Sequence, residues 1–313
     1  MRSHPRREGT DSHRPRAAYL DLGLEEIQAR AERALRNLAR CASCARACGV
    51  DRLAGPAGSC HTGRRARVAS YFPHHGEEPP ISGWRGSGTI FFARCNLACV
   101  YCQNSDISQA DDGVEVADEQ LAGMMLELQA MGCHNINLVS PSHVVPQFLA
   151  ALALAVPAGL SLPIVYNTGG YDSLATLRLL DGIVDIYMPD AKYDDDAIAA
   201  QFSGVPHYVK VNRLCLKEMH RQVGDLRPID GVAARGLLVR HLVLPEGLAG
   251  TEGVVRFIAE EISPYTYVNV MPQYRPCYQA FRYPSLRRRI TDGEYAAALR
   301  SARSVGLWRG LGR

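Results

Sequence analysis

Three closely spaced cysteines are the residues in this sequence best suited to chemistry. Cys95, Cys99 and Cys102 form a Cys-x3-Cys-x2-Cys pattern within one short segment. Three thiolates on one loop can bind three irons of a [4Fe-4S] cluster, whereas four would saturate it. The fourth iron would stay open, and the amino and carboxylate groups of S-adenosylmethionine can chelate it. One electron from such a cluster would cleave the sulfonium and release a 5′-deoxyadenosyl radical.

Two other interpretations of these thiols stay open. A zinc site would need a fourth ligand close by, and the loop supplies none. An electron-carrying cluster would need a fourth thiolate, which Cys133 is near enough in the sequence to supply. The motif follows the apolar run 88–94, a predicted strand, and the active sites of (β/α) barrels lie in the loops after the strands. This context favours the open iron.

A second group of cysteines lies upstream with the spacing Cys-x2-Cys-x3-Cys-x11-Cys. Its members are Cys41, Cys44, Cys48 and Cys60. Four thiolates in so short a segment can close a tetrahedral zinc site or hold a second iron–sulfur cluster, and the spacing does not choose between them. Reduced cysteines without metal are the remaining interpretation.

The composition places these cysteines in a reducing environment. Seven of the ten cysteines lie in the two tight groups, and residues 1–16 lack the apolar core of a signal peptide, so we expect metal ligation in preference to disulfides. No apolar run is long enough to span a bilayer, and a formal net charge of +3 is too small to imply nucleic acid. We expect a cytoplasmic protein that binds neither membrane nor nucleic acid. The scattered cysteines are expected to be ordinary buried side chains: Cys133, Cys215 and Cys277.

Apolar strand-like runs alternate with helical patterns over most of the chain. Six runs are continuously apolar, as in a parallel sheet that is covered on both faces. They are 88–94, 135–139, 164–167, 184–188, 237–244 and 267–271. The helical patterns between them are 118–131, 144–155, 173–180, 194–223 and 253–262. Since six βα units are too few for an eight-stranded barrel, we predict an α/β fold with an open, partial (β/α)6 barrel.

The N-terminal part differs in character from the predicted barrel. Residues 1–20 are basic and poor in large apolar residues, which predicts a disordered tail. Residues 21–80 contain a predicted helix at 24–40 and the upstream cysteines, so we expect a Cys-rich, metal-binding helical extension. A Pro/Gly loop near residue 80 marks the boundary to the barrel, which covers 81–313 with a C-terminal extension.

The proline-rich loop at this boundary carries two histidines and two glutamates. These residue types suit a metal, but the surrounding prolines indicate a loop that covers the predicted cluster. We therefore expect a cover at His74, His75, Glu77 and Glu78.

The downstream motif resembles the signature of the radical S-adenosylmethionine (SAM) superfamily, Cys-x3-Cys-x-aromatic-Cys, with Tyr101 in the aromatic position. GSGTIFFARCNLACVYCQN, VDIYMPDAKY and VRHLVLP are similar to the pyruvate formate-lyase activating enzymes. HHGEEPPISG, HNINLVSPSHVVPQ and KEMHRQVGD resemble a less characterised branch homologous to them. The resemblance covers about residues 41–280. It implies an oxidoreductase with a [4Fe-4S] cluster and S-adenosyl-L-methionine.

The resemblance also implies which residues bind the cofactor. Tyr101 would pack on the adenine or shield the cluster, and Arg240 matches an arginine that meets the cofactor carboxylate. Two strand ends would hold the methionine moiety through Asn167, Thr168, Met188, Asp190 and Lys192. Among these, Lys192 suits a carboxylate and Asp190 suits an ammonium.

Three departures from the family pattern bear on the site. Asn167 stands where an aspartate is usual, which weakens the expectation of a monovalent cation. The segment SPSH at 140–143 replaces Gly-Gly-Glu, so Ser140 or backbone carbonyls would recognise the amino group. A histidine near the sixth strand has no match, and Gln273 or Tyr274 would fill its place.

The resemblance implies hydrogen abstraction from a protein substrate, such as the backbone glycine of a glycyl-radical enzyme. It also implies a low-potential electron donor such as flavodoxin or ferredoxin. The same chemistry serves other peptides, small molecules and RNA, so the substrate stays open. A non-catalytic iron–sulfur electron carrier and a zinc-scaffolded interaction module are the alternatives from other classes.

Overall fold

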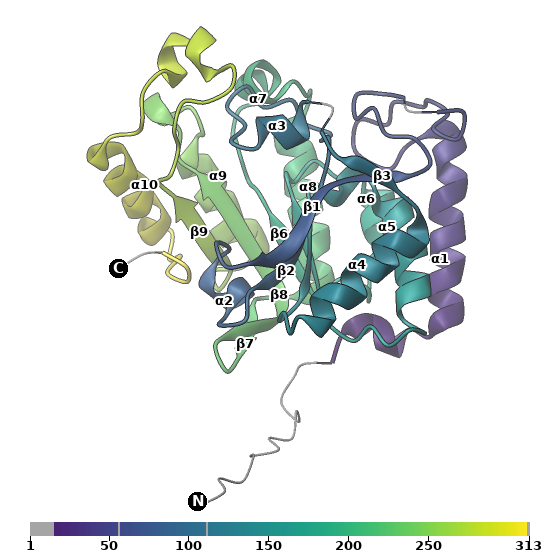
Figure 1. Cartoon of the computed structure of the whole chain (residues 1–313). Coiled ribbons are helices and arrows are strands. Elements are labelled where there is room, and N and C mark those ends of the chain that lie inside the picture. Colours follow the sequence, from purple (N-terminus) through teal and green to yellow (C-terminus); the bar gives the residue numbers. More distant parts are fainter. Residues whose placement is uncertain (1–15, 56, 111, 312–313) are drawn as a thin grey trace, which may run out of the picture.

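A mixed sheet, with nine strands among the described residues, forms the centre of the fold. The structure is a computed structural model that describes residues 16–55, 57–110 and 112–311 (Figure 1). Six neighbouring strands are parallel, and each coincides with one of the six apolar runs. They are β2 (Ser87–Phe92), β4 (Ile136–Val139), β5 (Ile164–Thr168), β6 (Ile186–Pro189), β8 (Val232–Leu242) and β9 (Tyr267–Met271). The predicted α/β class with six parallel units is confirmed.

The sheet is open and is extended at both edges by antiparallel strands. β1 (Ala66–His74) pairs with β2, and β3 (Val114–Val116) pairs with β1. At the other edge, β8 pairs with β9 and with the short β7 (Arg227–Ile229). The sequence pattern does not predict these three strands, because they are short or, in β1, only the first and third residues are buried.

Helices pack on the outer face of the parallel strands, around a large apolar core. Figure 1 shows four of them together on one side: α1 (Leu24–Arg36), α4 (Asp118–Ala130), α5 (Val145–Ala155) and α6 (Leu174–Leu179). The others are α8 (Tyr208–Val223), which packs on β6 and β8, α9 (Thr251–Phe257) and α10 (Asp292–Ser304). Within the described part of the chain, no helix combines the length and the apolar character needed to cross a bilayer.

The inner face of the parallel strands changes from apolar to polar along the strands. Val165 and Leu238 are fully buried there, in a small apolar cluster with Ile81 of α2 (Pro79–Ser82). Side chains alternate along a strand, so two residues further on the same face presents Asn167 and Arg240. The carboxyl ends of the strands thus form a polar region above an apolar floor.

The ordered part of the N-terminal stretch begins before residue 21, where the predicted disordered tail was expected to end. Residues 1–15 of the predicted tail lie outside the described residues, but for residues 17–20 the prediction of disorder is wrong. Tyr19 is fully buried and donates to the carbonyl of Leu162 (2.9 Å). β1 precedes the boundary expected near residue 80, yet it pairs with β2 from Val68 to His74. The sheet therefore begins within the stretch assigned to the extension.

Candidate active site

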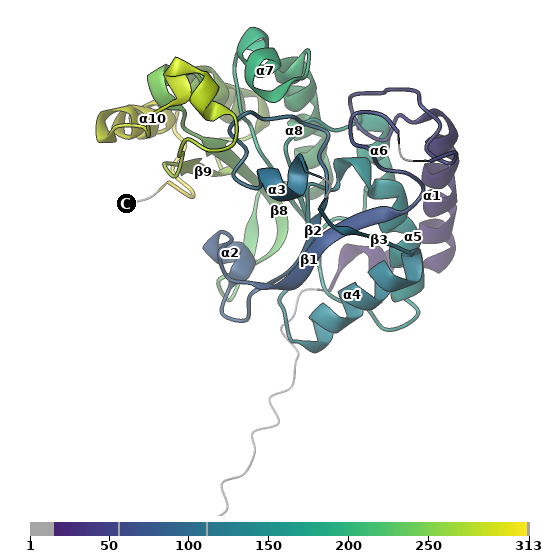
Figure 2. The ribbon, with the colours of Figure 1, turned by 45° about the horizontal axis from the view of Figure 1, so that its top comes forward.

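The three downstream cysteines lie on one loop at the carboxyl end of β2. This cysteine loop leads to α3 (Ser105–Ser108) and carries Cys95, Cys99 and Cys102. Its backbone is tied to the end of α7 (Asp196–Ser203), where Ala98 N–H donates to the carbonyl of Ser203 and Val100 N–H to that of Phe202 (both 2.9 Å). Figure 2 turns this end of the sheet, with α3 and α7, toward the reader. The fold therefore places the thiols where the motif predicts them.

The surroundings of the thiols suit a metal centre. Cys99 Sγ lies 2.9 Å from Ser203 Oγ, and Cys102 Sγ lies 3.1 Å from Ser108 Oγ. Burial raises the pKa of Cys95 to about 12, and the charges of the other two thiols act in the same direction. Burial also raises the pKa of Cys99. A cation would therefore be needed to hold Cys95 and Cys99 as thiolates, and an isolated nucleophilic cysteine would have the opposite shift.

The spacing of the thiols bears on the kind of metal. Among the described residues, no three Cys, His, Asp or Glu side chains are grouped for a single ion. A cubane cluster binds each thiolate at a different iron, so its ligands stand further apart than those of one ion. The three thiols are still close enough to act on one another's charge. The cysteine loop therefore fits a cluster better than a lone zinc ion.

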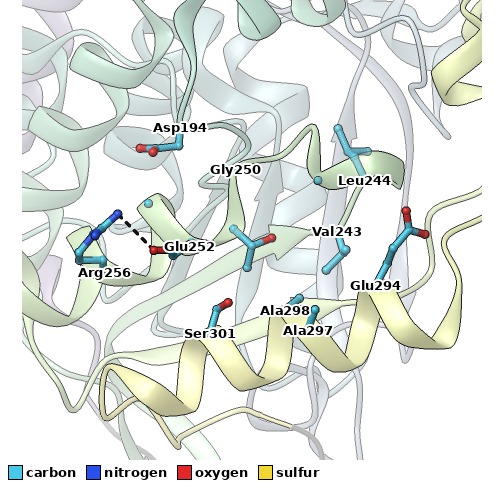
Figure 3. A pocket seen from close by; sticks show the side chains of 13 residues that line it. Asp194, Val243, Leu244, Gly250, Glu252, Arg256, Glu294, Ala297, Ala298 and Ser301 are labelled. Carbon is cyan, nitrogen blue, oxygen red and sulfur yellow. Dashed lines mark ion pairs between the residues drawn. The ribbon is translucent and has the colours of Figure 1, made fainter.

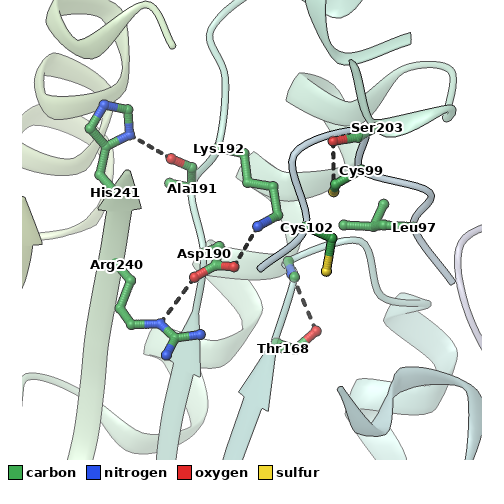
Figure 4. Close-up of polar contacts among 12 residues, drawn as sticks. Leu97, Cys99, Cys102, Thr168, Asp190, Ala191, Lys192, Ser203, Arg240 and His241 are labelled. Carbon is green, nitrogen blue, oxygen red and sulfur yellow. Dashed lines mark hydrogen bonds and ion pairs between the residues drawn. The ribbon is translucent and has the colours of Figure 1, made fainter. Parts of the chain in front are cut away.

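A buried ion-pair network at the strand ends faces the cysteine loop (Figure 4). Lys192 Nζ donates to Asp190 Oδ2 (2.6 Å), and Arg240 Nε donates to Asp190 Oδ1 (3.0 Å). Arg240 Nη2 also donates to Asn167 Oδ1 (2.6 Å). Burial alone would raise the pKa of Asp190, but Arg240 and Lys192 together lower it. Four predicted residues, from β5, β8 and the end of β6, are thus brought together around an ionised carboxylate.

The loop after β5 allows the network and the cysteine loop to approach closely. Gly170 has φ +75°, and a Cβ there would lie 2.2 Å from Asn212 Nδ2 and 2.3 Å from the carbonyl oxygen of Asp190. At Gly169, a Cβ would lie 2.6 Å from the Leu97 side chain. Only glycine fits at position 170, and at position 169 a Cβ would displace the Leu97 side chain, so these two residues bring the strand end against the cysteine loop.

Ser140 and Thr168, two predicted cofactor-binding residues, lie in a hydrogen-bonded group after β4 and β5. The N–H of Ser140 donates to the carbonyl of Asn167 (2.8 Å), with the serine in a left-handed conformation at φ +57°. The hydroxyl of Thr168 lies 3.0 Å from that of Ser142 and donates to Asp172 Oδ2 (2.8 Å). The Thr168 hydroxyl therefore orders the two loops.

Two other predicted cofactor-binding residues point into packed surroundings. Met188 is fully buried in the small apolar cluster of the inner face, so the structure gives its side chain a packing role. The Tyr101 hydroxyl is hydrogen bonded to that of Tyr193, and its ring packs edge-on against Tyr274 at 5.9 Å between centroids. Tyr101 therefore anchors the cysteine loop to Tyr193 and Tyr274 by packing and a hydrogen bond.

The loop before α2 brings two carboxylates to the Arg240 network, which the sequence interpretation misses. Glu77 Oε2 lies 3.8 Å from Arg240 Nη1, and Glu77 Oε1 accepts from Asn137 (3.0 Å). Glu78 Oε1 accepts from Asn269 (2.9 Å). Glu77 thus lies against the same arginine that pairs with Asp190, and the expectation that this loop covers the cluster stays a prediction. No local pattern predicts which side of the sheet a loop closes.

The upstream cysteines lie against the loops of the candidate site. A β-bridge joins Cys44 to Asp172, and Arg46 Nε donates to the carbonyl of Asn96 (2.5 Å). Three of the four thiols are buried and one is exposed: Cys41, Cys44 and Cys60 are buried, and Cys48 is exposed. Zinc or a second cluster at these residues stays a prediction.

Of the scattered cysteines, Cys277 and not Cys133 lies near the cysteine loop. Cys133 is fully buried beside Gly88, at the amino end of β2, whereas the loop follows the carboxyl end. Its suggested role as a fourth ligand is therefore wrong. Cys277 Sγ donates to the carbonyl of Tyr101 (3.2 Å) and its charge interacts with that of Cys102. Cys277 and Tyr101 are far apart in the sequence, so the spacing of the cysteines does not predict this contact.

A separate cavity of about 540 Å³ lies beside α9 and α10 (Figure 3). Its lining includes Asp194, Thr251 and Glu294, together with an ion pair between Arg256 and Glu252 (3.7 Å). Among the described residues, none of the predicted site residues lines it. The chemistry expected of the cysteine loop is therefore not located in this cavity.

Comparison by sequence gives a relative that matches most of this chain. Uncharacterized protein MJ0674 from Methanocaldococcus jannaschii is 31% identical over 274 residues, which cover 85% of this chain and 75% of that protein. No family model matches the sequence.

Comparison by structure gives more distant matches. A radical SAM methyltransferase from Sphaerobacter thermophilus has 11% identity and a TM-score of 0.47, with 70% of this chain and 64% of that chain covered. Native anSMEcpe with bound AdoMet has 13% identity and a TM-score of 0.47, with 68% and 57% covered. The chain thus spans less than two thirds of the length of these proteins. Matches of this kind carry no argument about what the chain binds.

Proposed function

We propose that this chain, which belongs to the same family as uncharacterized protein MJ0674 of Methanocaldococcus jannaschii, is a radical SAM enzyme that cleaves S-adenosylmethionine with a [4Fe-4S] cluster. The observation that most supports this is the position of the cysteine loop. It lies at the carboxyl ends of parallel strands, beside Asp190 and Lys192 (Figure 4). Enzymes built from βα units carry their reacting groups at this end of the sheet.

The cysteine loop fits a cluster with one open iron. Its thiols would bind three irons and leave the fourth for the amino acid end of the cofactor. When bound, the cluster would supply the electron that cleaves the sulfonium into methionine and a 5′-deoxyadenosyl radical. The hydroxyls of Ser203 and Ser108, 2.9 and 3.1 Å from two of the sulfurs, would donate hydrogen bonds to the thiolates and raise the reduction potential.

The ion-pair network suits the zwitterionic end of the cofactor. Asp190 and Lys192 present opposite charges 2.6 Å apart, so an ammonium would bind to the first and a carboxylate to the second. Arg240 donates to both Asp190 and Asn167. We therefore assign Arg240 the role of positioning these two side chains, in place of the direct carboxylate contact that the resemblance implies. Ser140 would lie at the edge of the same site.

For the substrate we propose a protein partner from which hydrogen is abstracted, as in the glycyl-radical activating enzymes that the sequence resembles. The support is the likeness of the three stretches around the cysteine loop, β6 and β8. Other peptides, small molecules and RNA are alternatives. All ten cysteines are free, which suits the reducing cytoplasm, where flavodoxin or ferredoxin would supply the electron.

Reductive cleavage is the first test. The protein is reconstituted anaerobically with iron and sulfide and incubated with dithionite and S-adenosylmethionine, and 5′-deoxyadenosine is measured by chromatography. We expect the product from the native chain and none from Cys99→Ala. Cys133→Ala is the matched control, because Cys133 is buried at the opposite end of β2. Absence of product from protein that holds a full cluster would contradict the proposal.

The substrate needs its own test. Candidate glycyl-radical proteins are incubated with the active enzyme, and electron paramagnetic resonance is used to look for a glycyl doublet. A doublet that depends on Cys99 supports the activating role. If 5′-deoxyadenosine forms but no candidate acquires a radical, the cleavage proposal stands and the proposed partner does not.

A non-catalytic electron carrier is the second candidate, and Cys277 is the observation that favours it. Its thiol lies beside the cysteine loop and could bind the fourth iron. Electron–nuclear coupling between isotopically labelled S-adenosylmethionine and the cluster distinguishes the two functions. Coupling requires an open iron, whereas a cluster that is saturated by four thiolates would show none.

A further inference from the structure

The segment that carries the upstream cysteines has no apolar core of its own. This Cys-rich segment, residues 41–63, lies between α1 and β1 and contains no helix or strand among its described residues. Irregular segments of this length are uncommon in compact domains. Apart from Gly63, its buried side chains are three thiols and three polar residues: Cys41, Cys44, Cys60, Ser43, Arg52 and Thr62. Something other than apolar burial must therefore hold the segment together.

The backbone of the segment turns so that its four thiols approach one another. Cys41 N–H donates to the carbonyl of Val50, and Gly49 N–H donates to the carbonyl of Cys41 (both 2.9 Å). Cys44 is close enough to both Cys41 and Cys60 for their charges to interact. The sulfur of Cys48 lies 2.9 Å from the place of a Cβ on Gly58, a glycine with φ +70° that stands two residues before Cys60. The four thiols thus lie in one region, although among the described residues no three of them are grouped closely enough for a single ion. A metal centre here therefore requires the side chains to turn inward, the exposed Cys48 above all.

Arg52 is a buried cation beside these thiols. Its side chain is fully buried and donates to the carbonyls of Thr62 (2.7 Å), His143 (2.8 Å) and Gly63 (3.2 Å). Its remaining polar contact is with Cys41 Sγ (3.6 Å), and no carboxylate among the described residues pairs with it. A guanidinium stays charged in proteins, and a buried charge without a counter-charge is costly. The negative charge that Arg52 requires would come from thiolates.

The segment also touches the loops that carry the candidate active site. Arg52 donates to the carbonyl of His143, at the end of the SPSH segment. Cys44 forms a β-bridge with Asp172, which accepts from Thr168. Arg46 donates to the carbonyl of Asn96 in the cysteine loop. The loops after β2, β4 and β5 therefore all rest on this segment.

We propose that Cys41, Cys44, Cys48 and Cys60 bind one thiophilic metal centre with Arg52 as its counter-cation, and that this centre holds the loops 140–143 and 168–172 in place. Four thiolates around Zn²⁺, or around an oxidised [4Fe-4S] cluster, leave a net negative charge, which matches the buried guanidinium. Arg52 then acts as a positioning residue that joins the centre to the SPSH segment. The proposal does not depend on the cleavage of S-adenosylmethionine.

The metal is tested on a full-length chain in which the downstream cysteines are removed by Cys95→Ala, Cys99→Ala and Cys102→Ala. Zinc, iron and sulfide are measured per chain after anaerobic purification. We expect about one zinc, or about four irons with equal sulfide, and the choice between these identifies the metal. Addition of Cys60→Ser should remove it. A triple variant that neither contains nor takes up zinc or iron and sulfide would overturn the proposal, whatever the native chain does with S-adenosylmethionine.

The role of Arg52 is tested by Arg52→Met in the same background. The metal affinity, measured by competition with a chelator, should fall by about tenfold or more. Arg52→Lys should recover part of it, and Arg40→Met, at an exposed position just before the segment, should leave it unchanged. Wild-type affinity in Arg52→Met would overturn the counter-cation role.

The link to the active-site loops is tested by hydrogen exchange on one chain with and without its metal. Amides in 140–143 and 168–172 should exchange about tenfold faster after chelation. Those of α10, which packs on α9, should not change. Equal exchange in the two states would show that the centre does not hold these loops.

Discussion

Asp190 is shared by two cations whose side chains are largely shielded from water. The side chains of Arg240 and Lys192 are only 18% and 17% exposed, so their charges interact with Asp190 more strongly than charges at the surface do. We expect Asp190→Asn to lower the free energy of unfolding by about 3 kcal/mol or more, because Lys192 loses its counter-charge and Arg240 keeps only the more distant Glu77. Urea unfolding followed by circular dichroism measures this loss.

Glu261→Gln is the matched control for that substitution. The pair between Lys217 and Glu261 has the same 2.6 Å separation as the pair between Lys192 and Asp190, but its side chains are 46% and 47% exposed. Solvent screening should make its loss much smaller than that of Asp190→Asn. Losses of equal size in the two variants would show that burial does not strengthen the Asp190 network.

His143 makes the stability of the fold depend on pH. Burial lowers the pKa of its imidazole from 6.5 to about 3, and the nearby Arg52 acts in the same direction. The unfolded chain binds a proton below pH 6.5, whereas the folded chain binds it only near pH 3. Stability is therefore lost as the pH falls through this window, by about 1.4 kcal/mol per pH unit. Urea midpoints between about pH 7.5 and about pH 5 measure the slope.

His143→Gln separates this titration from other effects of acid. The amide can still donate to the carbonyl of Ala93, which lies 3.1 Å from Nε2 of the imidazole, but it does not titrate. The variant should lose the part of the slope that belongs to His143. If its slope equals that of the native chain, the titrating group lies elsewhere.

At the scale of elements, the loop after β5 depends on a glycine for both conformation and space. A Cβ at Gly170 would overlap Asn212 and the carbonyl of Asp190, and φ +75° adds conformational strain. We expect Gly170→Ala to cost more than about 2 kcal/mol. Gly132 isolates the conformational part, because it has φ +88° with nothing within 4 Å of a Cβ. Gly132→Ala should cost about 1 kcal/mol in the same unfolding experiment, and equal costs would show that the close approach is not tight.

The parallel strands were predictable because their signal is local. Both of their faces are buried, so each reads as a continuous apolar run, and the helices between them have clear periodicity. β1 is different, because its buried residues are only Ala66 and Val68 and its remaining residues are stabilised by pairing with β2. Pairing of this kind depends on the partner strand, and a single sequence does not show it.

The residues of the candidate site also fall into those that the sequence predicts and those that it misses. Cys95, Asp190 and Lys192 follow directly from strands, so the motif and the strand ends locate them in advance. Glu77 and Cys277 reach the site from loops that are distant in the sequence, and their contacts depend on how those loops pack. Proximity in the chain therefore predicts the residues of the strand ends and misses those that loops bring in.

At the scale of the molecule, the N-terminal stretch is attached to the barrel at both ends. At its start, Ala18 N–H donates to Asp185 Oδ1 (2.9 Å) and Tyr19 donates to the carbonyl of Leu162. At its end, β1 is part of the central sheet. Helix α1 lies between these points and packs on α5. We therefore infer that the stretch folds together with the barrel and not as a separate unit.

Tyr19→Ala tests this inference, because it removes the attachment at one end only. Loss of a fully buried ring should cost about 3–5 kcal/mol, whereas Tyr19→Phe, which loses only the hydrogen bond to Leu162, should cost about 1 kcal/mol. If the chain unfolds as one unit, labelling of the buried Cys41 thiol and of Cys133 in the barrel core will show the same urea midpoint, and Tyr19→Ala will shift both equally. Labelling of Cys41 at lower urea than Cys133 would mean that the N-terminal stretch opens by itself, and the attachment at Tyr19 would then be local.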